Sequence, residues 1–509
     1  MNIARQLTLL IKLSVLLLCS HAAADGSGPL LTDTRFTLAD CIDFINDRSP
    51  QVSCGFIELP SDHDNDTGRI ISLPILIAKQ TLSGSASDKA ILIPGGGGPG
   101  GSMGFGFGSP PGEYLSYYRG LRDAGFDIII VDQRGAGFAR PGLRCVETSR
   151  AFKWSIVADL TLADELAAYS QAIAKCHQRL VQQGINLTDF DTYQSARDFL
   201  EIINALPYST WGTLATSYAT VIVQAMEQLK PDTFERIVLD SPVPMDYQEP
   251  FTLESSKASI TRVLTLCEAT RRCSNKYKNI KDKFQAVIDK TRDKPLAIRV
   301  KVVDTDTRPV ARKLIVNDHT LLDMLVVASY NNYRIADIPR VIDQLNSNNV
   351  NALIPIAEDY WYASSDLEFA DALSWTVHCK ERLPLEQQFL QRNPSRQQSY
   401  SAATNLIREA ERLACKEWDI GTRTLKNTTM LNPETLIITG DLDPVISKAD
   451  VANTIKIFRN KKSTNIAGMG HSVWYQSQCT RENVEDFFSR ASNQRGLLQN
   501  CRDGIARFK

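Results

Sequence analysis

The sequence WGTLATSYAT, residues 211–220, decides the fold. Residues 210–215 read as a short strand and residues 218–230 as a helix. Ser217 falls in the turn between them, with alanines two residues away on either side. A serine nucleophile requires such a turn, because small neighbours let the strand and the helix approach each other. Glycine is usual at both flanking positions, so on this motif alone a turn with a helix-capping serine is an equally good interpretation.

Strands and helices alternate on both sides of this turn. The alternation predicts a mostly parallel sheet with crossover helices, which is an α/β fold. From residue 245 to residue 432 the alternation stops and helical patterns dominate, so we expect an inserted, mostly helical domain between core segments 25–244 and 433–509. The other predicted strands are 55–60, 70–79, 90–93, 126–131, 234–239, 435–439 and 463–466, and the other predicted helices are 162–183 and 196–205.

Two segments near the C-terminus complete a candidate catalytic triad. Asp443 follows a predicted strand in the sequence GDLDP, and His471 lies in the glycine-lined loop GMGHS after the next strand. The order Ser217, Asp443, His471 is that of the α/β-hydrolase triad. In that triad the aspartate orients the histidine, which takes the serine proton as the serine attacks a carbonyl. Asp441 is the competing acid, and Asp443 fits better because Pro444 follows it.

The glycine run PGGGGPGGS, residues 94–102, follows another predicted strand. Its backbone can come close to a ligand and point N–H groups at an oxyanion. Gly95, Gly97 and Gly100 also have the spacing GxGxxG, so a dinucleotide-binding loop is the competing interpretation. Pro99 argues against it, because it interrupts the start of the helix that such a loop requires. We therefore expect no cofactor.

Residues 1–24 predict a secretory signal peptide. Arg5 and Lys12 precede a short apolar run, and three alanines follow it. The run is too short for a transmembrane anchor, and the bulky Leu18 before Cys19 argues against a lipoprotein signal. We expect an exported protein, periplasmic or extracellular, without a stable membrane anchor.

Removing the signal peptide removes one of eleven cysteines and leaves ten. An even count in an exported chain predicts disulfides, and the absence of any CxxC pair argues against a zinc ribbon, so we expect no metal. Short loops close at the smallest entropic cost, which favours bonds between sequential neighbours. The predicted pairs are Cys41–Cys54, Cys145–Cys176, Cys267–Cys273, Cys379–Cys415 and Cys479–Cys501.

Composition and charge exclude several other classes. The 509 residues are 43% hydrophobic and 23% charged, which excludes a collagen-like, coiled-coil or largely disordered chain. The net charge is −1, from 57 basic and 58 acidic residues, so there is no overall attraction to nucleic acid or to an anionic membrane.

Several of these segments together resemble the prolyl aminopeptidase and tripeptidyl aminopeptidase group of α/β-hydrolases, and the exported tripeptidyl-aminopeptidase-like branch matches best. The resemblance covers residues 41–505. It is carried by GGPGGS at 97–102, DQRG at 132–135, SY at 217–218, GDLDP at 440–444 and GH at 470–471.

The resemblance implies an α/β-hydrolase fold with a helical cap and a serine exopeptidase that acts on peptides with a free N-terminus. The oxyanion donors would be the N–H groups of Tyr218 and Gly98. The sequence VHCKE, residues 377–381, is similar to a cap segment of the family, so Glu381 would bind the substrate's α-amine; a surface glutamate beside a disulfide is the alternative. An esterase or lipase of the same fold and a catalytically silent binding protein are the competing hypotheses.

Overall fold

The computed structural model describes residues 33–82, 87–105, 114–246, 253–303, 309–364, 368–394, 406–490, 501 and 508. The predicted signal peptide lies outside these residues.

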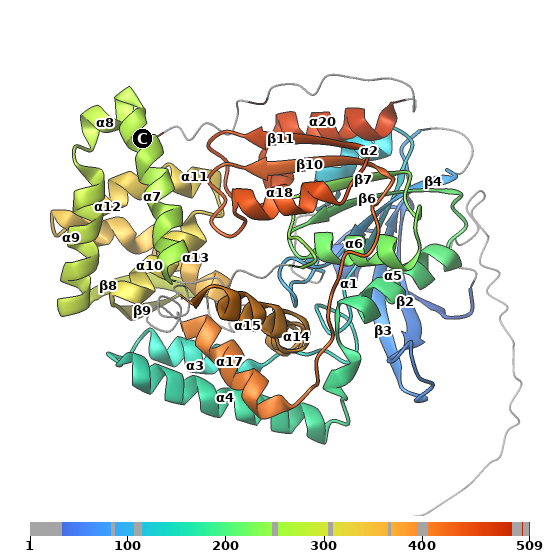
Figure 1. Ribbon diagram of the computed structural model, residues 1–509, viewed down its shortest axis with the longest axis horizontal. Helices are drawn as coiled ribbons and strands as arrows, with labels where there is room; N and C mark the ends of the chain where they lie inside the picture. The colour runs from blue at the N-terminus through green and yellow to red at the C-terminus, as the bar shows by residue number, and fades with distance from the viewer. Residues whose placement is uncertain are drawn as a thin grey trace, which may run out of the picture.

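A nine-stranded sheet forms the centre of the core (Figure 1). Its order is β1-β2-β3-β5-β4-β6-β7-β10-β11, with antiparallel pairing from β1 to β5 and parallel pairing from β5 to β11. The sheet is therefore mostly parallel, as predicted. The strands are β1 (Phe36–Ala39), β2 (Val52–Pro60), β3 (Ile70–Ala78), β4 (Lys89–Pro94), β5 (Asp127–Val131), β6 (Thr210–Thr216), β7 (Arg236–Asp240), β10 (Glu434–Gly440) and β11 (Lys461–Ile466).

Helices cover both faces of this sheet, because its central strands are apolar on both faces. In β4, Ala90 and Leu92 belong to one hydrophobic cluster, whereas Ile91 and Ile93 belong to another. The first cluster includes side chains of α5, α6 and α18, and the second includes side chains of α2, α19 and α20. These helices are α2 (Arg119–Asp123), α5 (Thr192–Ala205), α6 (Ala219–Leu229), α18 (Lys448–Lys456), α19 (Val473–Gln476) and α20 (Gln478–Ser489); the short α1 (Ile42–Ile45) joins the second cluster.

The insertion after β7 is mostly helical but also contains a β-hairpin that the sequence analysis did not predict. In β8, Ile298, Val300 and Val302 are buried, and charged residues alternate with them. This period-two pattern is the signal that was missed. The elements are α7 (Leu253–Ala269), α8 (Arg271–Lys276), α9 (Ile280–Asp293), β8 (Leu296–Val303), β9 (Pro309–Val316), α10 (Asp318–Ala328), α11 (Asn332–Ile335), α12 (Ile338–Asn346), α13 (Ile354–Ser364), α14 (Asp371–Val377), a π-helical turn (His378–Arg382), α15 (Leu383–Arg392) and α17 (Leu406–Trp418).

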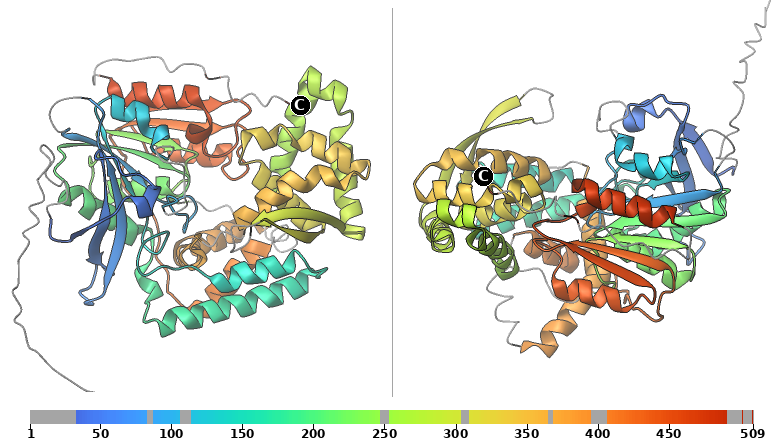
Figure 2. Two further views of the ribbon diagram at one scale, coloured as in Figure 1. Left: turned by 180° about the vertical axis from the view of Figure 1, so that it is seen from behind. Right: turned by 90° about the horizontal axis from the view of Figure 1, so that it is seen from above.

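Two earlier helices, α3 (Val146–Ser155) and α4 (Leu162–Gln182), pack against this insertion. Ile173 and Leu180 of α4 share a cluster with Ala410 and Ala414 of α17, and Phe152 of α3 packs with the lobe around β8. Figures 1 and 2 show α3 and α4 beside α15 and α17, apart from the sheet. The cap is therefore built from two separate stretches of the chain.

The five predicted disulfides are all present, with Cα–Cα distances from 5.0 to 5.6 Å. Cys145–Cys176 joins the start of α3 to α4, and Cys379–Cys415 joins the π-helical turn to α17. Among the described residues, no helix has both the length and the apolar character needed to cross a membrane.

Candidate active site

Ser217 occupies a strained turn between β6 and α6. Its φ angle is +58°, in the left-handed region that non-glycine residues seldom adopt. The turn is held from both sides, because the Ser217 N–H donates to the Asp240 carbonyl at 3.0 Å and the Ser217 carbonyl accepts from the Thr220 hydroxyl at 2.6 Å. Such strain at the end of a parallel strand is typical of a nucleophile elbow.

The two alanines flanking this turn are accommodated. Ala215 and Ala219 are buried, and the Ala219 N–H donates to the carbonyl of Gly96 at 2.9 Å. A Cβ atom on Gly96 would lie only 3.1 Å from Ala219. The missing side chain at Gly96 thus makes room for the methyl group at Ala219, and the elbow keeps its geometry without the usual glycines.

Asp443 and His471 form a buried pair. The Nδ1 atom of His471 lies 2.8 Å from Oδ2 of Asp443, and the two residues are only 5% and 2% exposed. The other oxygen of Asp443 accepts from the N–H groups of Val445 and Ile446, both at 2.9 Å. Asp441, the competing acid, instead accepts from the Gly468 N–H at 2.6 Å. The histidine is therefore oriented by Asp443, and its Nε2 atom is left for a reacting group.

Electrostatics favour charge separation within this pair. Burial raises the pKa of Asp443, but the charge and hydrogen bond of His471 outweigh it and hold that pKa below its usual value. Burial lowers the pKa of His471, but the charge and hydrogen bond of Asp443 outweigh it and raise that pKa above its usual value. The pair is thus suited to stabilise an imidazolium that forms during a proton transfer.

Asp240, at the end of β7, links the elbow to the histidine loop. Its carbonyl accepts from Ser217, and its carboxylate accepts from the N–H groups of Val473 and Trp474, both at 3.0 Å. Burial raises the pKa of Asp240 to about 6. Because β7 lies between β6 and β10 in the sheet, Asp240 brings Ser217 and His471 to the same edge. The sequence analysis missed this residue, although a buried acid at a strand end was a readable signal.

The glycine run lies against the elbow. Gly98 has a φ angle of +57°, and a Cβ atom there would meet only the ring of Phe369, at 3.6 Å. A Cβ atom on Gly97 would have no neighbour within 4 Å. The oxyanion roles of Gly98 and Tyr218 stay predictions. Within the described residues 101–105 no helix follows the glycines, which removes the geometry that a dinucleotide-binding loop requires.

The DQRG segment, residues 132–135, makes hydrogen bonds to the glycine loop and to the residues that follow it. Asp132 accepts from the N–H groups of Met103 at 2.5 Å and Phe138 at 3.2 Å, and Gln133 donates to the Gly101 carbonyl at 3.2 Å. Burial raises the pKa of Asp132 to about 7. This segment therefore fixes the shape of the glycine loop.

The cap contacts the site from several directions. Arg262 of α7 donates to the Asp443 carbonyl at 2.7 Å, and the ring of Tyr330 lies edge-on to His471 with centroids 5.2 Å apart. On the side of the glycine loop, the Ala370 N–H donates to Gly100 at 2.9 Å. The cap thus borders both the histidine and the glycine loop.

Glu381 does not have the environment predicted for it. It is 0% exposed, and its two carboxylate oxygens accept hydrogen bonds from the N–H group, at 2.7 Å, and the hydroxyl of Thr192. Burial, with the nearby charge of Asp191, raises the pKa of Glu381 to about 8. A carboxyl group enclosed in this way presents no surface to a substrate amine, so the structure corrects the predicted amine-binding role.

One group of described residues has a spacing suited to a metal ion, namely Cys145, Glu147 and Cys176. The two cysteines are bonded to each other, and Glu147 accepts from Arg179 at 2.7 Å. A cysteine binds a metal ion as a free thiolate, and neither cysteine is free here, so these residues do not form a metal site.

The comparisons agree with the fold. A sequence profile described as the alpha/beta hydrolase fold matches residues 91–271. Together with the strand order, the elbow and the Asp–His pair, this match shows that the chain has the α/β-hydrolase fold. No curated protein sequence matches the chain.

Solved structures with a similar arrangement include a serine hydrolase from Cycloclasticus zankles, which is 11% identical with a TM-score of 0.37 and covers 87% of this chain and 100% of its own. Another is a meta-cleavage product hydrolase from Pseudomonas fluorescens IP01, which is 14% identical with a TM-score of 0.33 and covers 82% of this chain and 94% of its own. A similarity this low carries no inference about activity.

Proposed function

We propose that the protein is a serine hydrolase that uses Ser217, His471 and Asp443. The observation that carries this proposal is the buried 2.8 Å contact between His471 and Asp443 at the sheet edge where Ser217 sits at a φ angle of +58°. Nε2 of His471 takes the proton of Ser217 while Oγ attacks the substrate carbonyl. The N–H groups of Tyr218 and Gly98 would receive the oxyanion.

The same groups then complete the reaction. The tetrahedral intermediate collapses, His471 gives its proton to the leaving group, and an ester links the acyl group to Ser217. A water molecule loses a proton to His471 and attacks this ester. The second collapse returns the proton to Ser217 and releases the acid.

We further propose that the substrates are peptides with a free N-terminus and that the mature protein is exported. The order and spacing of the motifs shared with the prolyl and tripeptidyl aminopeptidases support the first part, as does a cap that borders both His471 and the glycine loop. Five disulfides support the second part, because such bonds persist in oxidising compartments.

An esterase of the same fold is the second candidate, and the burial of Glu381 favours it. With Glu381 enclosed, the residue predicted to read the substrate amine is no longer available. An ester substrate requires no such partner.

Two measurements test these proposals. A fluorophosphonate probe should label the wild-type protein and not the Ser217→Ala variant. If the probe does not label the wild type, both enzyme hypotheses fail and the hypothesis of a catalytically silent binding protein stands. A panel of chromogenic peptides with free and acetylated N-termini, together with p-nitrophenyl esters, then separates the two enzymes. An aminopeptidase loses activity on acetylated peptides, whereas turnover of esters alone would refute the peptidase.

A further inference from the structure

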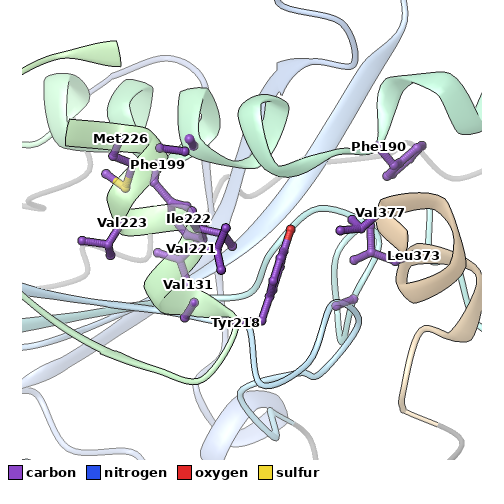
Figure 3. Close-up of a cluster of buried hydrophobic side chains, with 14 of the residues drawn as sticks. Val131, Phe190, Phe199, Tyr218, Val221, Ile222, Val223, Met226, Leu373 and Val377 are labelled. Atoms are coloured by element: carbon purple, nitrogen blue, oxygen red, sulfur yellow. The ribbon is translucent and has the colours of Figure 1, made fainter. Parts of the chain in front are cut away.

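The side chain of Tyr218, the residue after the nucleophile, is buried between the core and the cap. It is 5% exposed and shares a hydrophobic cluster with Val221 of α6 and with Val377 of α14. Figure 3 shows its ring between these two residues. The backbone that would supply an oxyanion donor is therefore anchored by a side chain that contacts the cap.

The Tyr218 hydroxyl continues this anchor as a hydrogen-bond chain. It lies 2.8 Å from Oγ1 of Thr192, the first residue of α5, and Thr192 is itself fully buried. The Thr192 hydroxyl also makes a hydrogen bond to the carboxyl group of Glu381, so Thr192 lies between Tyr218 and Glu381. Thr192 also donates its backbone N–H to Glu381 at 2.7 Å. Three buried groups thus join the elbow, the start of α5 and the cap.

The cap segment that carries Glu381 is also held by contacts other than those to Thr192. The Cys379–Cys415 bond ties it to α17, and the Lys380 carbonyl accepts from the Arg423 N–H at 2.6 Å. The Lys380 ammonium donates to Asp191 at 2.6 Å. These contacts hold the two residues that precede Glu381, so the segment is a firm support for the hydrogen bonds that Glu381 makes to Thr192.

We propose that Glu381 is a positioning residue that acts through Thr192 and the Tyr218 side chain to hold the Tyr218 N–H in place for the oxyanion. This inference rests on the proposed function, because it requires a reaction at Ser217. Removing an oxyanion donor altogether lowers kcat by about 10²–10³-fold. Loosening the donor should lower it by less, about tenfold, and should leave substrate binding unchanged.

The test uses four variants of the full chain: Glu381→Ala, Glu381→Gln, Tyr218→Phe and the double variant Glu381→Ala/Tyr218→Phe. Glutamine keeps an oxygen for the Thr192 N–H and offers an amide donor to the Thr192 hydroxyl, so it should restore the anchor. The matched control is Glu386→Ala, since Glu386 is 1% exposed in the next helix and faces His378 at 4.0 Å instead of the elbow. The readouts are the rate of fluorophosphonate labelling and kcat and KM on a p-nitrophenyl ester and on a free peptide.

We expect Glu381→Ala and Tyr218→Phe each to lower labelling and kcat about tenfold on both substrates, with KM within about twofold. The double variant should lose no more than either single variant, because both changes break one chain. Glu381→Gln should stay within about threefold of the wild type. Melting temperatures, compared with Glu386→Ala, separate general destabilisation from this effect.

Several outcomes would overturn the proposal. Losses that add in the double variant would show that the two residues act separately. A rise in KM for the free peptide alone in Glu381→Gln would restore the amine-binding role. Wild-type kinetics in Tyr218→Phe would refute the anchor even if Glu381→Ala failed to fold. Absence of labelling in the wild type would refute the proposed function instead, which keeps the two failures distinct.

Discussion

Replacing Asp443 with asparagine should nearly abolish activity while leaving the fold intact. In the wild type, one oxygen of Asp443 accepts two backbone N–H groups and the other faces Nδ1 of His471. An asparagine must keep its oxygen toward the two N–H groups, because turning it round would place two donors against two donors. Its amide group then points at His471.

This orientation fixes the wrong tautomer of the histidine. Nδ1 must accept from the amide, so the remaining proton of the neutral ring sits on Nε2, where it cannot accept the Ser217 proton. The same change in a serine protease lowers kcat by about 10⁴-fold, and we expect a loss of about 10³–10⁴-fold here. That corresponds to about 4–5.5 kcal/mol of transition-state stabilisation.

The assay is kcat and KM on a p-nitrophenyl ester, with the rate of fluorophosphonate labelling as an independent measure. Asp441→Asn is the matched control, because the amide oxygen can still accept from the Gly468 N–H. It should stay within about threefold of the wild type. Two results would refute this assignment of Asp443: a loss of kcat below about tenfold in Asp443→Asn, or a loss of kcat in Asp441→Asn that exceeds the loss in Asp443→Asn.

Three further predictions concern strain, pH and covalent bonds. Ser217→Gly should abolish activity yet raise the free energy of unfolding by about 1 kcal/mol in urea titration, because glycine adopts a positive φ without strain. Ser217→Ala is the control and should show no such gain. Equal stability of the two variants would contradict the strain at this position. Activity should fall as the pH drops through the raised pKa of His471, because the base must be neutral. Stability should change in the opposite direction. The contribution from the contact with Asp443 is fully present below about pH 6.5, the pKa of an unfolded histidine, and is lost as the pH rises through the folded pKa. A kcat/KM profile whose acidic limb falls below pH 6 would contradict the raised pKa. Replacing both Cys379 and Cys415 with serine should lower the free energy of unfolding by about 3–4 kcal/mol for a separation of 36 residues, and an unchanged denaturation midpoint would contradict it.

Local patterns were enough to predict every strand of the large sheet except β1, and they also suggested the candidate triad. The central strands are short apolar runs, and Ser217, Asp443 and His471 each lie in a turn or loop that follows a strand. Parallel strands deliver their carboxyl ends to one edge, so three residues far apart in the sequence could be expected to meet. The five disulfides were also predictable from the sequence, because each joins two cysteines that are neighbours in the order of cysteines along the chain.

The features that the sequence did not reveal depend on long-range packing. Glu381 meets Thr192 across 189 positions of sequence, and no local pattern distinguishes that contact from an exposed glutamate. The helix α4 has an ordinary crossover pattern, yet it packs on α17 because Ile173 and Leu180 find partners there. Asp240 resembles any other acid at the end of a strand, and only the fold brings the first two N–H groups of α19 to its carboxylate.

The arrangement of the disulfides has a consequence for how the chain is made. The five bonded intervals follow one another along the sequence, and none encloses or overlaps another. In an oxidising compartment each cysteine that emerges second can therefore bond to the one before it, and the first pairing formed is the native one. Assembly of the covalent framework would then need little correction by disulfide exchange, even though the cap itself is completed only when α17 returns to α4.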